Sequence, residues 1–147
     1  MSNNIRKNFD KEAILEMYAK VSKNTLMETL GIKYVDAGPE YLVATMPVKP
    51  EVHQPMGLLH GGASVALAES LGSGASLMLI DPETQEIRGI EISANHVKSK
   101  RAGLVTGTAK LIHRGRMLHL WEIRITDENG ELISLCKITN IVIDRRK

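Results

Sequence analysis

The first thirty residues carry a helical pattern of apolar positions. Between Lys11 and Leu30 the apolar side chains recur mostly at steps of three and four, which is the spacing of one face of an α-helix. These positions are Ile14, Leu15, Met17, Tyr18, Val21, Leu26, Met27 and Leu30. Gly31 follows the pattern and is a typical helix stop. We therefore expect residues 1–30 to form an N-terminal helical leader.

Extended segments follow the leader. Lys33–Val35 leads to a predicted turn at Asp36–Glu40, and Tyr41–Val48 alternates in the manner of a strand. Beyond residue 84 the chain is rich in β-branched residues and alternation, and it predicts four more strands. Their ranges are Ile87–Val97, Leu104–His113, Met117–Thr126 and Leu132–Ile143. Gly115 and the run Asp127–Gly130 indicate hairpin turns between the last three.

The segment from Gly57 to Ile80 has the length of a membrane span. Glu69 is its one formally charged residue, and a carboxylate near the middle of a bilayer would be costly. Half of the segment is Gly, Ala or Ser, so its hydrophobicity is modest. We therefore expect a long helix from Leu59 to about Ile80, buried inside a globular protein and closed by the Asp81-Pro82 step.

The element order is α-β-β-α-β-β-β-β, without an internal repeat or a linker. Consecutive strands joined by short turns favour an antiparallel sheet, and the long Gly/Ala-rich helix would pack across it. The pattern predicts a single α+β domain over residues 1–147, with a basic tail over 143–147. Arg145, Arg146 and Lys147 are expected to be a disordered end.

Composition narrows the class of protein. The chain has 147 residues, a formal charge of +2 from 19 basic and 17 acidic side chains, and one cysteine, Cys136. The balanced charge does not indicate a nucleic-acid-binding protein, and one cysteine excludes an intrachain disulfide framework. The N-terminus is polar and charged through Glu12, so no secretory signal peptide is visible and a cytoplasmic location is the default.

The most unusual string in the chain runs from His53 to Ser64. At the start of a helix the first backbone N–H groups lack partners, and an oxyanion is welcome there. Gly61 and Gly62 would let a ligand approach the backbone, while His60 and Gln54 add side-chain donors. The string outlines an oxyanion hole. The alternative is a plain helix start with a capping histidine.

Glu69 adds a candidate catalytic group. A carboxylate inside an otherwise uncharged helix is usually paired or functional, because bare burial is costly. Ser73 lies four residues later on the same face and is placed to share a water or bond the carboxylate. The alternative is a glutamate that reaches solvent or a lysine.

Helix geometry separates these two groups. Glu69 lies nine residues beyond His60, which is ~13 Å along the axis and about half a turn away. The two side chains cannot meet across one substrate carbonyl within one helix. If both act on it, two copies of the helix must lie side by side and antiparallel. This predicts an obligate dimer with two shared sites.

The string His53-Gln54-Pro55-Met56-Gly57-Leu58-Leu59-His60-Gly61-Gly62, followed by Glu69, resembles the hotdog-fold acyl-CoA thioesterases. The similar branch holds the phenylacetate-pathway (PaaI-type) enzymes, one class of 4-hydroxybenzoyl-CoA thioesterases and the 1,4-dihydroxy-2-naphthoyl-CoA hydrolases. The resemblance covers nearly the whole chain from Gly31. It implies a hotdog fold, with a long helix wrapped by an antiparallel sheet, in homodimers that commonly pair into homotetramers.

The resemblance also implies roles by position. Glu69 would be the catalytic carboxylate, as nucleophile or as general base, and the Gly61 N–H would polarise the thioester carbonyl with help from Gln54 and His60. Ser73 would position the water. The residues implied for binding of the acyl group and CoA are Met56, Gly62, His96, Val97, Lys98, Arg114, Gly115 and Arg116. No cofactor is implied, since CoA is part of the substrate, and no nucleic-acid or membrane partner is expected.

Other functions fit less well. Gly62–Ala66 is one residue short of a nucleophile elbow, but the βα units of an α/β-hydrolase are missing. The five histidines show no metal-ligand spacing, and His113 and His119 are expected to be ordinary polar strand residues. A hotdog sensor that binds acyl-CoA without cleaving it remains the main alternative, and Glu69 argues against it. A hydratase would need an Asp/His pair that the sequence does not offer.

Overall fold

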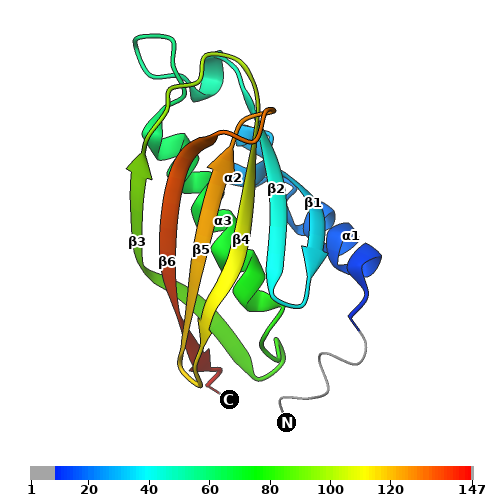
Figure 1. Ribbon diagram of the computed structural model, residues 1–147. Coiled ribbons are helices and arrows are strands. Elements are labelled where there is room, and N and C mark those ends of the chain that lie inside the picture. Colours follow the sequence, from blue (N-terminus) through cyan, green and yellow to red (C-terminus); the bar gives the residue numbers. More distant parts are fainter. Residues whose placement is uncertain (1–8, 147) are drawn as a thin grey trace.

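Helix α3 (Gly61–Leu77) lies against a six-stranded antiparallel sheet that curves around it. The computed structural model describes residues 9–146. The strand order is β1-β2-β4-β5-β6-β3, so β1 and β3 form the two edges (Figure 1). The strands are β1 (Lys33–Gly38), β2 (Tyr41–Val48), β3 (Gln85–His96), β4 (Gly103–Arg114), β5 (Leu118–Thr126) and β6 (Leu132–Asp144).

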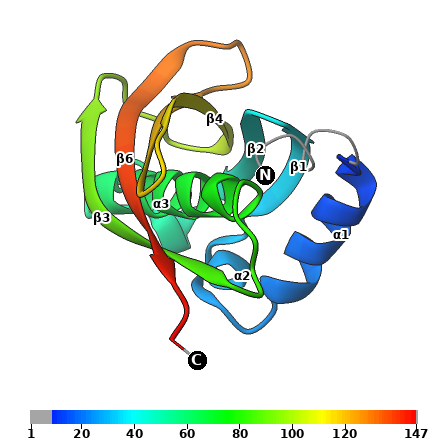
Figure 2. The ribbon, with the colours of Figure 1, turned by 90° about the horizontal axis from the view of Figure 1, so that it is seen from below.

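The sheet forms because one face of each strand is apolar. Along β5, Trp121, Ile123 and Ile125 are fully buried toward α3, and the residues between them point away. Figure 2 shows α3 enclosed by the curve of the sheet. This arrangement confirms the expected α+β class, with a helix wrapped by an antiparallel sheet.

Small residues let α3 approach its own sheet. A Cβ on Gly72 would lie 2.2 Å from Cγ2 of Ile138, and a Cβ on Gly107 would lie 2.5 Å from Cδ1 of Leu71. At these positions there is no room for a side chain within the chain itself, because helix and strands share one densely packed core. Gly72 of α3 therefore has a packing role that does not require a second helix.

Polar contacts fix the helix at its C-terminal half. Trp121 Nε1 donates to Ser76 Oγ at 2.8 Å, and Tyr18 Oη donates to the Gly74 carbonyl at 2.5 Å. Tyr34 Oη donates to the Ser70 carbonyl at 3.0 Å. Three polar side chains from the sheet and from α1 thus hold α3 against the strands, two through its backbone carbonyls and one through the Ser76 hydroxyl.

The leader is two helices rather than one. Helix α1 (Lys11–Val21) and helix α2 (Leu26–Leu30) are separated at Asn24, which has a φ of 59°. The predicted stop at Gly31 is confirmed, with a φ of 71°. Residues 1–8 of the expected leader lie outside the described part of the chain.

Other boundaries also shift. Strand β1 continues to Gly38, so most of the turn expected at Asp36–Glu40 is strand, with a bulge between Tyr34 and Asp36. A 3-10 turn, η1 (Pro50–Val52), follows β2. Helix α3 starts two residues later than expected because His60 caps it, and it ends at Leu77 rather than near Ile80.

The C-terminal end is more ordered than expected. Strand β6 runs through Asp144, so residues 143 and 144 are not part of a tail. The Arg145 N–H donates to the Thr84 carbonyl at 2.8 Å, and its Nε donates to the Gln85 carbonyl. Arg145 is therefore bonded to the start of β3, while Lys147 lies outside the described residues.

None of the helices within residues 9–146 has both the length and the apolar character that crossing a bilayer requires.

Candidate active site

The N-terminus of α3 presents one unpartnered backbone N–H. His60 caps the helix, since its Nδ1 accepts from the Gly62 N–H at 2.8 Å. The N–H groups of Ala63 and Ser64 donate to the His60 carbonyl at 3.0 and 3.2 Å. The Gly61 N–H has no partner within residues 9–146. It is the donor that remains available to a ligand oxygen at the positive end of the helix.

The cap also defines how His60 can act. Because Nδ1 accepts a hydrogen bond, the neutral imidazole carries its proton on Nε2. The side chain is exposed, and Nε2 is the ring nitrogen that can donate a second hydrogen bond. The capping role and the donor role of His60 are compatible, since they use different ring nitrogens.

The loop before α3 is held by its own backbone. The Gln54 N–H donates to the Leu58 carbonyl at 2.8 Å, and the Gly57 N–H donates to the Gln54 carbonyl at 2.9 Å. The side-chain oxygen of Gln54 accepts from the Met56 N–H. Gly57 has a φ of +75°, a conformation that favours glycine. Met56 itself is 74% exposed.

His96 lies at the start of α3. Its Nδ1 is hydrogen-bonded to the hydroxyl of buried Ser134, and its Nε2 lies 2.7 Å from the point that a Cβ on Gly61 would occupy. The glycine therefore makes room for the imidazole. This contact brings the end of β3 next to the unpartnered Gly61 N–H.

A pocket of about 330 Å³ opens at this end of α3. The predicted site residues among its lining are Gln54, Gly61, His96, Val97 and Lys98, and Ser64, Leu58, Leu59, Ser99 and Ile133 complete it. The loop, the helix N-terminus and the end of β3 thus form one concave surface with several hydrogen-bond donors.

Glu69 does not line this pocket. It lies farther along α3, over Gly89 of β3, where a Cβ on Gly89 would lie 2.4 Å from Glu69 Oε1. Burial raises the pKa of the Glu69 carboxyl above its ordinary value, and a hydrogen bond from Ser73 partly offsets this. The pair Glu69 and Ser73 is therefore formed as expected, but apart from the Gly61 end of the same helix.

Arg114 is the last residue of β4, and Gly115 and Arg116 follow it in the turn before β5. The turn between β4 and β5 lies at the other end of the sheet (Figure 1). Arg114 donates to the Leu79 carbonyl at 2.8 Å, just beyond the C-terminus of α3, and the Gly115 N–H donates to the Leu118 carbonyl at 2.7 Å. Arg116 is exposed. These three residues are remote from the pocket of their own chain.

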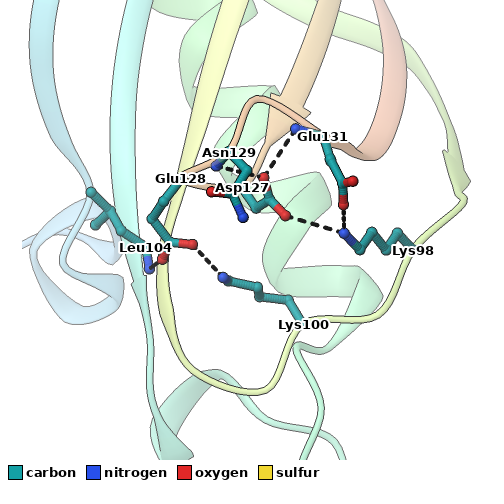
Figure 3. A network of polar contacts seen from close by, with 7 residues as sticks. All are labelled: Lys98, Lys100, Leu104, Asp127, Glu128, Asn129 and Glu131. Carbon is teal, nitrogen blue, oxygen red and sulfur yellow. Dashed lines mark hydrogen bonds and ion pairs between the residues drawn. The ribbon is translucent and has the colours of Figure 1, made fainter.

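Lys98 is engaged with carboxylates (Figure 3). Its Nζ lies 3.3 Å from Asp127 Oδ2 and also pairs with Glu131, both in the turn between β5 and β6. In the same network Lys100 pairs with Glu128, which also accepts from the Leu104 N–H at 2.6 Å. The contact with Lys100 and this N–H lower the pKa of Glu128 to about 2.

This network of ion pairs fixes the position of a loop that lines the pocket. The two lysines hold the loop from Val97 to Ala102 against the β5–β6 turn, and that loop lines the pocket. Sequence reasoning expected Lys98 to contact CoA. In the structure Lys98 is paired with carboxylates and positions the wall of the pocket.

A polar row beneath α3 was not anticipated. In the strand register Gly89 lies opposite Asn140, Asn140 lies opposite His119, and His119 lies opposite Arg114. The row therefore crosses β3, β6, β5 and β4. His119 is 2% exposed, and burial, with Arg114 and His113 nearby, lowers its pKa to about 4. His119 is therefore a buried neutral base and not an ordinary polar strand residue.

The alternation of β5 already contained this signal. His119 stands two residues before Trp121, in phase with the inward positions Ile123 and Ile125. Asn140 stands in the same way two residues after Ile138 on β6. Among residues 9–146, no three His, Cys, Asp or Glu side chains gather as a metal site would require.

Comparison with known proteins agrees with this geometry. Residues 56–134 match the thioesterase superfamily. The chain is 45% identical over 122 residues to a 1,4-dihydroxy-2-naphthoyl-CoA hydrolase of Listeria monocytogenes, covering 83% of this chain and 98% of the relative. It is 45% identical over 129 residues to a proofreading thioesterase EntH of Cronobacter turicensis, covering 88% and 93%.

A solved thioesterase structure has the same fold as this chain. The crystal structure of a variant of thioesterase PA1618 from Pseudomonas aeruginosa matches with a TM-score of 0.87 at 42% identity, covering 89% of this chain and 94% of that one. The chain therefore belongs to the thioesterase superfamily, and it is a thioester hydrolase with the hotdog fold.

Proposed function

We propose that the protein hydrolyses an aryl- or small acyl-CoA thioester to the free acid and CoA in the cytoplasm. The observation that carries this proposal is the unpartnered Gly61 N–H at the start of α3, bordering a pocket lined by Gln54 and His96. Thioester cleavage builds negative charge on the carbonyl oxygen, and a fixed N–H at a helix N-terminus stabilises that charge.

In the proposed reaction the carbonyl oxygen accepts from Gly61 N–H, with His60 Nε2 and the Gln54 side chain as further donors. Glu69 takes a proton from a water held by Ser73, and the water oxygen attacks the carbonyl carbon. The carbon–sulfur bond then breaks, and the thiolate of CoA leaves and is protonated. Burial, which raises the pKa of Glu69, makes it a stronger base than an exposed glutamate.

Two subunits are needed for this arrangement. Within one chain Glu69 lies outside the pocket at Gly61, so the carboxylate would come from a second copy. Strand β3 is an edge of the sheet, with Ile90 57% exposed, and an open edge of this kind can pair with the same edge of another copy. We propose a homodimer with two shared sites, pairing further into a homotetramer.

CoA binding is assigned by the same reasoning. Met56, Gly62, His96 and Val97 would line the path of the acyl group and the pantetheine arm. Arg114, Gly115 and Arg116 would meet the nucleotide end, and exposed Arg116 is free to form charge-assisted hydrogen bonds with phosphate. Lys98 is retained as a pocket residue, although its pairing with Asp127 and Glu131 limits its contact with phosphate.

The name of one relative, a 1,4-dihydroxy-2-naphthoyl-CoA hydrolase, supports an aryl substrate. The deciding assay is free-thiol release from a panel of aryl- and alkyl-CoA thioesters by wild type and Glu69→Gln. We expect release by the wild type, fastest with an aryl thioester, and near-complete loss in the variant. Tight acyl-CoA binding without release would favour the non-catalytic sensor.

A further inference from the structure

Asn140 is a buried side chain with a fixed orientation. It lies on β6, is 0% exposed, and its Nδ2 donates to the Gly72 carbonyl at 3.0 Å and to Ser76 Oγ at 2.8 Å. A backbone carbonyl can only accept, so the amide nitrogen must face α3 at this point. The direction of Oδ1 follows from these two bonds, and Asn140 Oδ1 has no hydrogen-bond partner within the described residues.

An oxygen of the Glu69 carboxylate and the unpartnered amide oxygen both lie near Gly89. Asn140 Oδ1 lies 3.5 Å, and Glu69 Oε1 lies 2.4 Å, from the same point, which is where a Cβ on Gly89 would be. The missing side chain of Gly89 therefore leaves a gap with an oxygen of each residue beside it. An alanine at 89 would overlap the carboxylate and push it away from Asn140.

Two oxygens that only accept cannot bond each other without a proton. Beside an ionised Glu69 the amide oxygen of Asn140 is left unsatisfied, which is unfavourable for a buried acceptor. Beside a protonated Glu69 it accepts the carboxyl O–H, and both groups are satisfied. The arrangement thus favours the form of Glu69 that exists after it has taken a proton from water.

We propose that Asn140 is a positioning residue for Glu69, whose Oδ1 receives the hydrogen bond of the protonated carboxyl across the gap that Gly89 leaves open. The inference rests on the base role proposed for Glu69 above. In the reaction the water O–H bond breaks and the carbon–oxygen bond forms. Glu69 keeps the proton, which is hydrogen-bonded to Asn140 Oδ1, until the departing CoA thiolate takes it.

Few other groups that titrate face this point. From α3 the Ser73 hydroxyl bonds Glu69. From β5 His119 lies beside Asn140 with a pKa of about 4, so it stays neutral at higher pH, and from β4 Arg114 is bonded to the Leu79 carbonyl. On β3 the exposed pair Glu86 and Arg88 bond each other. A shift in the titration of Glu69 can therefore be traced to Asn140.

The first test is the acid limb of the kcat/KM profile. Asn140→Ala removes the acceptor, and we expect the limb to move about one pH unit lower because the protonated carboxyl loses its partner. Asn140→Asp keeps an oxygen there, and its charge moves the limb to higher pH. Gly89→Ala leaves Asn140 in place but displaces Glu69, and it should move the limb down like Asn140→Ala.

Ser76→Ala is the matched control, because it removes one Nδ2 bond of Asn140 and leaves Oδ1 untouched. It should lower Tm without moving the limb. If Asn140 only ties α3 to β6, the Asn140 variants would lower Tm in the same way and leave the limb where it is. An acid limb that stays in place in both Asn140→Ala and Gly89→Ala would overturn the inference.

A second test does not depend on activity. Glutamine at 69 mimics the protonated carboxyl and donates permanently to Asn140, so Glu69→Gln should raise Tm in the wild-type background and much less in Asn140→Ala. Equal changes in the two backgrounds would contradict the contact. Wild-type turnover in Glu69→Gln would instead overturn the proposed function, and the role of Asn140 with it.

Discussion

The imidazole of His96 occupies the space that a side chain on Gly61 would need, with Nε2 2.7 Å from the position of the absent Cβ. The residue whose backbone N–H is unpartnered within residues 9–146 is thus also the residue against which His96 packs. The hydroxyl of Ser134 fixes the other ring nitrogen. Gly61 therefore provides the unpartnered backbone N–H and also the space that the His96 imidazole occupies beside it.

Gly61→Ala is predicted to reduce kcat/KM by up to about 100-fold, because the backbone N–H is kept but displaced, and complete loss of one oxyanion donor costs about 3 kcal/mol. The added Cβ must displace His96 and with it the wall beside the N–H. Steady-state kinetics on an aryl-CoA thioester measure the loss, and circular dichroism checks the fold. In a His96→Ala background the same substitution should cost less, since the ring is gone. Equal costs would contradict the steric account.

Glu69→Gln is predicted to stabilise the fold above the ordinary pKa of glutamate. The folded-state pKa of Glu69 is raised from 4.5, so the folded chain binds this proton more tightly than the unfolded chain. The stability it contributes is fully present below pH 4.5 and is lost as pH rises through the raised pKa. Tm of the variant should exceed that of the wild type near neutral pH, and the two should converge in acid. Exposed Glu83→Gln is the control, and a constant offset at all pH values would refute the linkage.

His119 is predicted to make the fold acid-sensitive. Its pKa falls from 6.5 to about 4 on folding, so the unfolded chain binds the proton more tightly between these values. Stability is fully present above pH 6.5 and declines as pH falls to 4, by up to about 3 kcal/mol. Urea unfolding across this range measures the decline, which His119→Leu should flatten. Exposed His113→Leu should leave it intact, and a profile unchanged by His119→Leu would contradict the prediction.

Lys98 and Arg116 are predicted to affect substrate binding differently. Lys98→Met releases the loop from Asp127 and Glu131, so it should raise KM to a similar extent for acyl-CoA and for the matching acyl-pantetheine. Arg116→Met should raise KM for acyl-CoA alone, because pantetheine lacks the nucleotide phosphates. The ratio of the two KM values for each variant is the measurement. A CoA-specific effect of Lys98→Met would assign it a phosphate instead.

Mixed dimers test the shared site. Gln54→Ala and Glu69→Gln should each be inactive alone, but a dimer of the two has one site with both native residues. Random exchange should restore about a quarter of wild-type turnover, since half of the dimers are mixed and each has one intact site. Mass spectrometry confirms exchange, and a sample with confirmed exchange and no recovered activity would exclude sharing between subunits.

The sequence predicted what depends on periodicity and local chemistry. The alternation in Tyr41–Val48 fixed that strand to the residue, and the small-residue run around Glu69 predicted a buried helix whose ends moved by only a few residues. The pairing of Glu69 with Ser73 followed from helix spacing alone.

Contacts between distant segments escaped prediction because they depend on strand register. The meeting of Gly61 with His96, and of Glu69 with Gly89 and Asn140, requires that β3 pair with β6, which no local pattern specifies. The helical leader was predicted, but its division into two helices was not, because apolar spacing does not reveal the positive φ of Asn24. Lys98 was assigned to CoA binding by the family resemblance, which does not show that its carboxylate partners lie in the turn between β5 and β6.

Strand β3 pairs with β6, the last strand described, rather than with a neighbour in the sequence. While the protein is being made, Glu69 and β3 leave the ribosome before β6 does, and no template for β3 yet exists. The surroundings of the carboxylate are therefore completed only after β6 has been made. A chain that lacks β6 has no partner strand for β3, so its Glu69 also lacks the surroundings that Gly89 and Asn140 provide.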